Sequence, residues 1–278
     1  MSYTAFTVSI NNGVAHVILS RPDMFNAMDG AFWGEIKTIF EDLPNNPEVR
    51  AIVLSSTGKH FSAGMELGYF GSAVAQMPQG EPGRQREQVR RMVLEFQSLF
   101  NAIDACRVPV LAALQGGCIG GAVDLACACD MRYCTSDAFF TIQEIKIGMT
   151  ADLGTLQRLP ALMPPSLARE LAYTGRKLLA DEARSSGYVT RVFDDHQAMI
   201  DGVLGIANDI AQRSPLAVTG SKEMLNYARD HSVADGLNYI ATWNAAMVIT
   251  QDLEEGMKAQ AEKRAPQYSN LMPRRPID

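Results

Sequence analysis

The stretch from Gly120 to Pro160 reads GGAVDLACACDMRYCTSDAFFTIQEIKIGMTADLGTLQRLP, and it carries three carboxyl groups among apolar residues. Asp124 is the only ionised side chain between residues 108 and 129, and Glu144 and Asp152 each lie in or beside a patch of Ile, Met, Ala and Leu. A carboxylate among apolar neighbours raises the free energy unless it is paired, hydrogen-bonded or protonated. Three such groups in one short region predict acid–base chemistry in a pocket that holds little water.

Two glycine-containing turns precede these carboxyl groups. Residues 116–121 (GGCIGG) lack the G-x-G-x-x-G spacing and the acidic partner of a dinucleotide site, and no G-K-[ST] sequence marks a P-loop. A helix that begins near Gly120 exposes free backbone N–H groups at its positive end. Residues 61–65 (FSAGM) repeat this arrangement after another strand. Two such turns facing each other predict an oxyanion hole, although each turn alone also fits a simple chain reversal.

The order of the elements predicts the fold class. Alternating residues in 6–10 and 14–19, on either side of Asn-Asn-Gly, indicate a hairpin, and residues 30–43 have helical spacing. Residues 51–55 and 108–114 are short apolar runs typical of buried strands. We therefore expect an α/β protein, a right-handed β/α coil with a mostly parallel sheet.

The second half of the chain is different. Helical patterns follow one another from residue 166 onward. In the first half, residues 71–90 are rich in Gly, Pro, Gln and charge, which predicts a mobile loop before a helix at 91–105. We expect an α/β core over residues 1–200 and a helical subdomain over residues 201–278 that packs against a neighbouring subunit.

Composition excludes several function classes. The 278 residues are 47% hydrophobic and 20% charged, and the net charge of −6 disfavours nucleic acid as a partner. No apolar run is long enough to span a membrane, so we expect no membrane partner. The first residues lack the pattern of a signal peptide and the last three are not a peroxisomal signal, which makes a cytoplasmic location the expectation.

The five cysteines lie between residues 106 and 134, an odd count in one apolar region. This distribution predicts reduced core thiols rather than a disulfide framework. Cys127 and Cys129 have the spacing of metal ligands, but no histidine lies near them in the sequence. We therefore expect no metal site.

Several motifs occur together in one order. They are Ser20-Arg21-Pro22, Asn26-Ala27-Met28, Phe61-Ser62-Ala63-Gly64, Gly120-Gly121, Cys129-Asp130, Gln157-Arg158-Leu159-Pro160, Glu255-Gly256 and Glu262-Lys263-Arg264. With these motifs the chain resembles the crotonase superfamily, the enoyl-CoA hydratase/isomerase fold, from Phe6 to about Tyr268. The resemblance implies a crotonase-type ββα superhelix with a C-terminal helical region, assembled as trimers or as hexamers made of paired trimers.

The resemblance also implies a set of binding residues. The N–H groups of Met65 and Gly121 would hold a thioester carbonyl, and the backbone around Asn26, Ala27 and Ala63 would line the groove for coenzyme A. Lys263 would meet a phosphate of coenzyme A across a subunit boundary, although a solvated helix face explains this residue equally well. The expected ligand is an acyl-CoA substrate, with no separate cofactor because coenzyme A is part of the substrate.

The three carboxyl groups suggest the reaction. Hydratases of the superfamily usually have Glu at the positions of Asp124 and Glu144 and a small residue at the position of Asp152. The combination seen here resembles the branch of the superfamily that converts 3,5-dienoyl-CoA to 2,4-dienoyl-CoA. That reaction removes a proton at C2 and adds one at C6, too far apart for one carboxylate. By family analogy Glu144 takes the C2 proton, Asp152 supplies the C6 proton and Asp124 orients the reacting groups; the reverse assignment of acid and base also fits.

Other interpretations remain at this stage. The chain also fits a 2-enoyl-CoA hydratase or another acyl-CoA isomerase, and a non-catalytic or RNA-binding member of the fold would explain the motifs without chemistry. Asp124 also fits the first turn of a helix, Asp152 fits an N-cap and Glu144 fits a solvated face. His60 and Ser62 suggest a hydrolytic pair, but the strand ends here, and we expect the two side chains to point in different directions.

Overall fold

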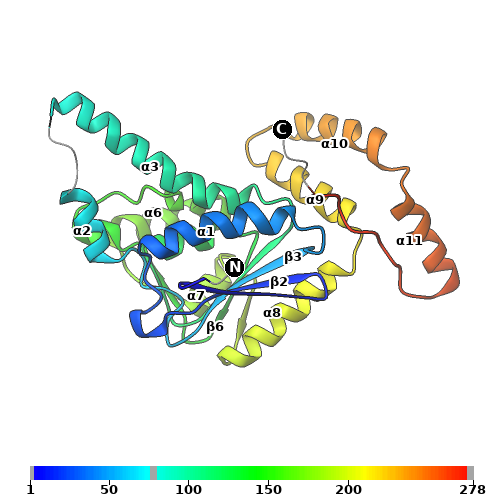
Figure 1. The fold of residues 1–278 in the computed structure, drawn as a ribbon, viewed down its shortest axis with the longest axis horizontal. Helices are drawn as coiled ribbons and strands as arrows, with labels where there is room; N and C mark the ends of the chain where they lie inside the picture. The colour runs from blue at the N-terminus through cyan, green and yellow to red at the C-terminus, as the bar shows by residue number, and fades with distance from the viewer. Residues whose placement is uncertain (1–2, 76–79, 274–278) are drawn as a thin grey trace.

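A computed structural model describes residues 3–75 and 80–273, and a six-stranded sheet forms its centre (Figure 1). The sheet has the order β1-β2-β3-β4-β6-β9, in which only the β1–β2 hairpin is antiparallel. Its strands are β1 (Phe6–Asn11), β2 (Val14–Leu19), β3 (Ala51–Ser56), β4 (Val110–Leu114), β6 (Met131–Thr135) and β9 (Arg191–Phe193). A smaller sheet contains β5 (Gly117–Ile119), β7 (Phe139–Thr141) and β8 (Leu178–Leu179). The predicted hairpin and the mostly parallel sheet are confirmed.

The central strands are buried on both faces. Every residue of β3 and β4 is buried, as expected of parallel strands that are covered on two sides. Successive side chains alternate between the faces: Ile52 and Leu54 join the main core, which includes α1 (Gly30–Asp42), whereas Val53 packs toward α8 (His196–Ala211). Figure 1 shows α1 and α8 on opposite sides of the sheet.

The other helices cover the sheet or extend from it. They are α2 (Leu67–Ala75), α3 (Pro82–Asp104), α4 (Gly121–Ala128), α5 (Thr155–Leu162), α6 (Pro165–Thr174), α7 (Ala180–Ser185), α9 (Pro215–Tyr227), α10 (Val233–Met247) and α11 (Gln251–Glu262). The short 3-10 helices are η1 (Pro22–Met24), η2 (Leu43–Asn45) and η3 (Glu144–Ile147). No helix in the described ranges is long and apolar enough to cross a membrane.

The predicted loop over residues 71–90 is wrong for most of its length. Its first residues belong to α2, and α3 already begins at Pro82; residues 76–79 lie outside the described part of the chain. Glu81 is the reason, because its side chain accepts hydrogen bonds from the backbone N–H groups of Gly83 and Arg84. Capping by Glu81 with Pro82 in the first turn starts a helix, so these residues belong to a helix start rather than a loop.

The C-terminal helices stand apart from the sheet only after α8. The boundary expected at residue 200 falls inside α8, whose residues Met199, Val203 and Ala207 are buried against the sheet. Helices α9, α10 and α11 lie beyond this layer, at one end of the molecule (Figure 1).

Candidate active site

The two glycine-containing turns lie against each other. Ser62 forms a parallel bridge with Cys118, in which the Ser62 N–H donates to Gly117 O at 3.2 Å and the Ile119 N–H donates to Ser62 O at 3.2 Å. Gly64 has φ +80°, and a Cβ atom there would collide with the carbonyl oxygen of Ile119. Glycine is therefore required for this close approach of two backbones.

Two unpaired backbone N–H groups meet at this junction. Met65 forms a parallel bridge with Met28, but the bonds run from the Met28 N–H to Gly64 O and from the Glu66 N–H to Met28 O. The N–H of Met65 thus points away from Met28, and it has no acceptor in the described part of the chain. Gly121 is the first residue of α4, so its N–H has no acceptor within the helix. A Cβ atom on Gly121 would lie 3.9 Å from the nitrogen of Met65, which places the two donors side by side.

A pocket of about 610 Å³ opens at these donors. Its wall includes Met65 and Gly121 together with Glu144 and Asp152. The remaining wall residues are Met24, Phe25, Ala27, Ala63, Glu66, Leu67, Tyr69, Phe70, Met92, Val93, Phe96, Ile119, Gly120, Gln143, Ile147, Met149 and Leu153. The pocket is thus largely apolar, and three carboxyl groups lie in its wall: Glu144, Asp152 and Glu66, whose carboxylate accepts hydrogen bonds from the backbone N–H groups of Gly68 and Tyr69.

Glu144 and Asp152 come from separate segments. Glu144 begins η3, and a Cβ atom on Gly120 would lie 3.1 Å from its Oε1 atom. Asp152 lies in the irregular segment between η3 and α5, and it does not cap α5, whose N-cap is Gly154. Burial raises the pKa of both carboxyl groups, and the charge of Asp152 raises the pKa of Glu144 further.

Asp124 lies behind the pocket rather than in its wall. Its side chain is in the first turn of α4 and is buried, and Oδ1 accepts a hydrogen bond from the backbone N–H of Thr155 at 2.6 Å. Burial raises the pKa of Asp124 to about 7, against the lowering effect of its hydrogen bond with Thr155. The structure therefore separates Asp124, which holds the start of α5, from Glu144 and Asp152, which line the pocket.

The residues expected to bind coenzyme A are only partly together. Ala27 and Ala63 line the pocket, whereas Asn26 is buried beside it, accepting from the N–H of Arg21 at 2.9 Å and donating to Thr57 O at 2.8 Å. Lys263 is exposed at the C-cap of α11 and is not among the residues that line this pocket. Helix α11 lies at the opposite end of the molecule from α2, whose residues Tyr69 and Phe70 line the pocket (Figure 1).

The suggested hydrolytic pair is excluded by its hydrogen bonds. The Nδ1 atom of His60 accepts from the backbone N–H of Gly117 at 2.9 Å. The hydroxyl of Ser62 is fully buried and donates to Asn26 O at 2.8 Å. Both side chains hold the backbone of the turns in place.

Sequence reasoning missed the apolar wall that α2 and α3 provide. Tyr69 and Phe70 come from α2, and Met92, Val93 and Phe96 come from α3. The helical spacing of Met92 and Phe96 was the available signal. A helix is expected at residues 91–105, but the spacing alone does not tell that this face of the helix lines the pocket.

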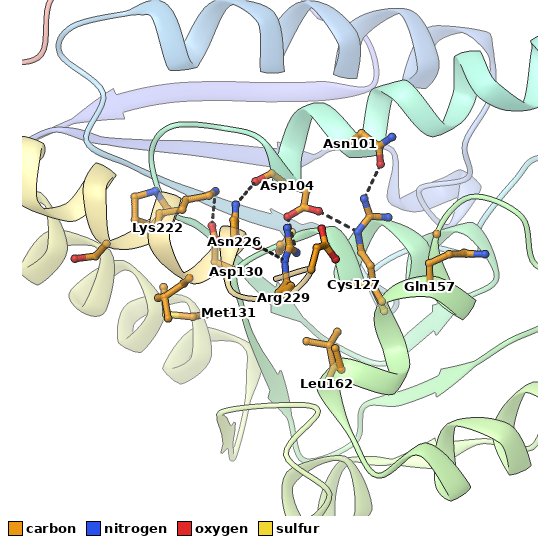
Figure 2. Close-up of a pocket in the computed structure, with 18 of the residues that line it drawn as sticks. Asn101, Asp104, Cys127, Asp130, Met131, Gln157, Leu162, Lys222, Asn226 and Arg229 are labelled. Carbon is orange, nitrogen blue, oxygen red and sulfur yellow. Dashed lines mark hydrogen bonds and ion pairs between the residues drawn. The ribbon is translucent and has the colours of Figure 1, made fainter. Parts of the chain in front are cut away.

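A second pocket of about 960 Å³ lies between the core and α9 (Figure 2). Its charged groups include two ion pairs: Lys222 with Asp130 at 2.7 Å and Arg229 with Asp104 at 2.9 Å. The sulfur atoms of Cys127 and Cys129 are buried at its edge. Within residues 3–75 and 80–273, no three His, Cys, Asp or Glu side chains are grouped closely enough to hold a metal ion.

Comparison with known proteins identifies the family. Residues 9–271 match the family model described as Enoyl-CoA hydratase/isomerase. The chain belongs to this family. An enoyl-CoA hydratase from Bacillus anthracis has the same fold, with a TM-score of 0.86 over 96% of this chain and 99% of that one at 28% identity. The resemblance to crotonases and the predicted fold class are thereby confirmed, and this member of the enoyl-CoA hydratase/isomerase family is an enzyme.

Two relatives are more similar in sequence. The mitochondrial Delta(3,5)-Delta(2,4)-dienoyl-CoA isomerase of Homo sapiens is 45% identical over 95% of this chain and 81% of its own length. The peroxisomal Delta(3,5)-Delta(2,4)-dienoyl-CoA isomerase of Arabidopsis thaliana is 45% identical over 94% of both chains. Those two proteins are named for organelles, so the cytoplasmic location expected for this enoyl-CoA hydratase/isomerase family member is not confirmed.

Proposed function

We propose that this enzyme converts 3,5-dienoyl-CoA to 2,4-dienoyl-CoA by moving a proton from C2 to C6. One observation carries the proposal: Glu144 and Asp152 come from separate segments and line the same apolar pocket as the N–H groups of Met65 and Gly121. The names of the human and plant relatives support the same reaction. A single carboxylate would suffice for a shift between neighbouring carbons, but a shift from C2 to C6 requires two.

The proposed reaction consists of two proton transfers. Glu144, ionised, takes the C2 proton, and the electron pair of that C–H bond enters a conjugated dienolate whose charge rests on the thioester oxygen. Asp152, protonated, gives its proton to C6, and the electrons return to form the 2,4-diene. The product is an isomer of the substrate. Exchange of protons with solvent then restores the ionised Glu144 and the protonated Asp152.

Backbone donors stabilise the dienolate in this proposal. The N–H groups of Met65 and Gly121 lie side by side, so one oxygen fits against both. The Gly121 N–H also belongs to the positive end of α4. Donors of this kind are fixed before the charge develops, and each contributes about 3 kcal/mol to stabilising a transition state.

The electrostatics suit the assigned roles. Burial raises the pKa of Asp152, which favours the protonated form that a donor needs. The raised pKa of Glu144 makes this carboxylate a stronger base once it is ionised. Asp124 touches neither reacting carbon in this proposal; it orients the reacting groups by holding the segment that leads from Asp152 into α5.

Coenzyme A enters the proposal as part of the substrate, with no separate cofactor. Ala27 and Ala63 would line its groove, and Asn26 would support that groove from behind through its hydrogen bonds to the backbone. We further propose a homotrimer or hexamer, in which Lys263 of one subunit meets the coenzyme A phosphates bound to another. The position of α11 supports this arrangement, because it lies at the opposite end of the molecule from α2, which lines the pocket of the same chain (Figure 1).

The test is to mix the purified protein with a 3,5-dienoyl-CoA and follow the ultraviolet absorbance of the conjugated product. We expect a rapid rise that falls about 100-fold or more in both Glu144→Gln and Asp152→Asn. Hydration of a 2-enoyl-CoA, measured in the same preparations, is the control for the alternative activity. Brisk hydration with no rise in absorbance would replace the isomerase by a hydratase.

A further inference from the structure

The backbone of Asp152 is held by a side chain of another helix. Asp152 lies in the irregular segment between η3 and α5, where no helix or strand fixes its conformation. Gln97 of α3 donates a hydrogen bond from Nε2 to the carbonyl oxygen of Asp152 at 2.6 Å. Among the described residues, this is the one hydrogen bond that reaches the backbone of Asp152 from another element.

The position of Gln97 places it at the junction of two pockets. Val93 and Phe96 of α3 line the pocket that contains the carboxyl group of Asp152. Gln97, one turn after Val93, lines the larger pocket on the other side. Leu153, next to Asp152, contributes to both walls. The hydrogen bond from Gln97 to Asp152 therefore lies between the two pockets.

The same helix also holds the segment that follows. Arg158 of α5 lies 3.3 Å from the carboxylate of Asp104 and donates to the side chain of Asn101 at 2.6 Å. Both partners belong to α3, and they are labelled in Figure 2. Helix α3 thus contacts the chain at Asp152 and again at Arg158, one turn into α5. These two contacts restrain the segment that runs from Asp152 into α5.

We propose that Gln97 is a positioning residue that aims the Asp152 carboxyl group at the distal carbon of the substrate. Fixing the carbonyl group fixes the peptide plane that follows Asp152, and with it the direction of the side chain. Because a misplacement of about 1 Å lowers a rate by about 100-fold, one such hydrogen bond matters for proton delivery. The inference rests on the proposed function, since it assigns Gln97 to the acid and leaves Glu144 independent of it.

The test separates the two proton transfers in deuterated water. The wild-type enzyme, Gln97→Leu and the matched control Ser98→Ala, at an exposed position of the same helix, are mixed with a 3,5-dienoyl-CoA. Two rates are measured for each: formation of the 2,4-diene and entry of deuterium at C2 of the recovered substrate. Leu keeps nearly the volume of Gln but has no donor, and circular dichroism checks that each variant is folded.

We expect Gln97→Leu to lower isomerisation by about 10- to 100-fold while C2 exchange stays at or above the wild-type rate, because a dienolate that is protonated slowly at C6 returns to substrate more often. Ser98→Ala should change neither rate. An unchanged isomerisation rate in Gln97→Leu would overturn the proposal, because packing of the neighbouring residues alone would then hold Asp152. A parallel fall of both rates would also overturn it, since that result indicates a general structural role. A wild-type enzyme that exchanges C2 without isomerising would instead refute the proposed function, and this inference with it.

Discussion

The carboxyl group of Asp124 ties the first turn of α4 to the first turn of α5, because its Oδ1 atom accepts the backbone N–H of Thr155 at 2.6 Å. Helix α4 begins with Gly121, one of the two unpaired N–H donors, and α5 follows the segment that carries Asp152. A buried side chain that does not line the pocket thus connects two of its walls. The protonation state of Asp124 therefore also affects the stability of the fold, independently of the reaction.

Asp124→Asn should stabilise the protein more at pH 8 than at pH 5. The pKa of Asp124 is raised from 3.8 to about 7 in the folded chain, so folding favours the protonated form. The stability contributed by this proton is fully present below about pH 4 and is lost as the pH rises through about 7. The full difference is on the order of 4 kcal/mol, and Asn keeps an oxygen acceptor without the charge. Urea unfolding at a fixed subunit concentration measures it; equal effects at both pH values would contradict the burial argument.

Gly64→Ala should separate the two glycine turns. A Cβ atom at Gly64 collides with the Ile119 carbonyl, and φ +80° is itself strained by about 1–2 kcal/mol for an Ala residue. We expect a loss of isomerase activity of about 100-fold, the usual effect of removing one oxyanion donor. Gly71→Ala in α2 is the control, because a Cβ atom at that position meets no atom within 4 Å. Similar activities in the two variants would show that the close approach at Gly64 is not needed.

How far the sequence predicted this site depends on the range of the interactions involved. The Gly-Gly pair before Asp124 marked the start of a helix, and local backbone preferences were sufficient to predict it. The separation of Asp124 from Glu144 and Asp152 was not predictable, because it depends on which side of α4 faces α5. Apolar neighbours in the sequence identify a carboxyl group as buried, but they do not tell whether it reaches a cavity.

The apolar wall shows the same limit in a different way. Composition in residues 71–90 indicated a loop, and the capping side chain of Glu81 instead begins α3 at Pro82. No sequence pattern indicated a role for Gln97. The hydrogen-bond partner of an amide on a helix surface cannot be read from the sequence. Long-range contacts such as Gln97 with Asp152 require the folded structure.

The pH dependence of isomerisation should be bell-shaped, with both limbs shifted upward from the ordinary pKa values of these carboxyl groups. The rate falls at low pH as Glu144 becomes protonated, and burial raises the pKa of Glu144 from 4.5. It falls at high pH as Asp152 ionises, and burial raises the pKa of Asp152 from 3.8. Steady-state measurement of kcat/KM from pH 4 to 10 reports two apparent pKa values, which belong to the coupled pair rather than to either residue. A rate that is constant over this whole range would contradict the assignment of a carboxyl acid and a carboxylate base.

Lys222→Met should destabilise the protein by about 3 kcal/mol without a direct effect on the reaction. The ammonium group of Lys222 is buried, lies 2.7 Å from Asp130 and donates to Val108 O at 3.1 Å (Figure 2). Removing the cation leaves Asp130 partly buried without its partner. The double variant Lys222→Met with Asp130→Asn should recover part of the loss, since it removes both charges. Denaturant unfolding tests this, and equal stability of the single variant and the wild type would contradict it.

Helix α10 should be covered by another copy of the chain in solution. All residues of α10 are described, and none of them is buried. Two of its apolar side chains are largely exposed, Val233 at 80% and Leu237 at 65%. Leu225 on α9 is also 71% exposed, so apolar surface continues onto the neighbouring helix. Uncovered apolar surface of this kind is typical of an interface.

Leu237→Asp places a charge on that surface and should shift the protein toward smaller species in sedimentation velocity. Burying the new charge would raise the free energy of association, whereas the monomer keeps it in water. Ser185→Asp, at an exposed position of α7, adds the same charge away from this surface and should leave the distribution unchanged. A wild-type protein that sediments as a monomer, or a Leu237→Asp variant with the wild-type distribution, would place the subunit contacts elsewhere. In that case the proposed contact of Lys263 with coenzyme A would be lost, because α11 lies at the opposite end of the molecule from α2, which lines the pocket of the same chain.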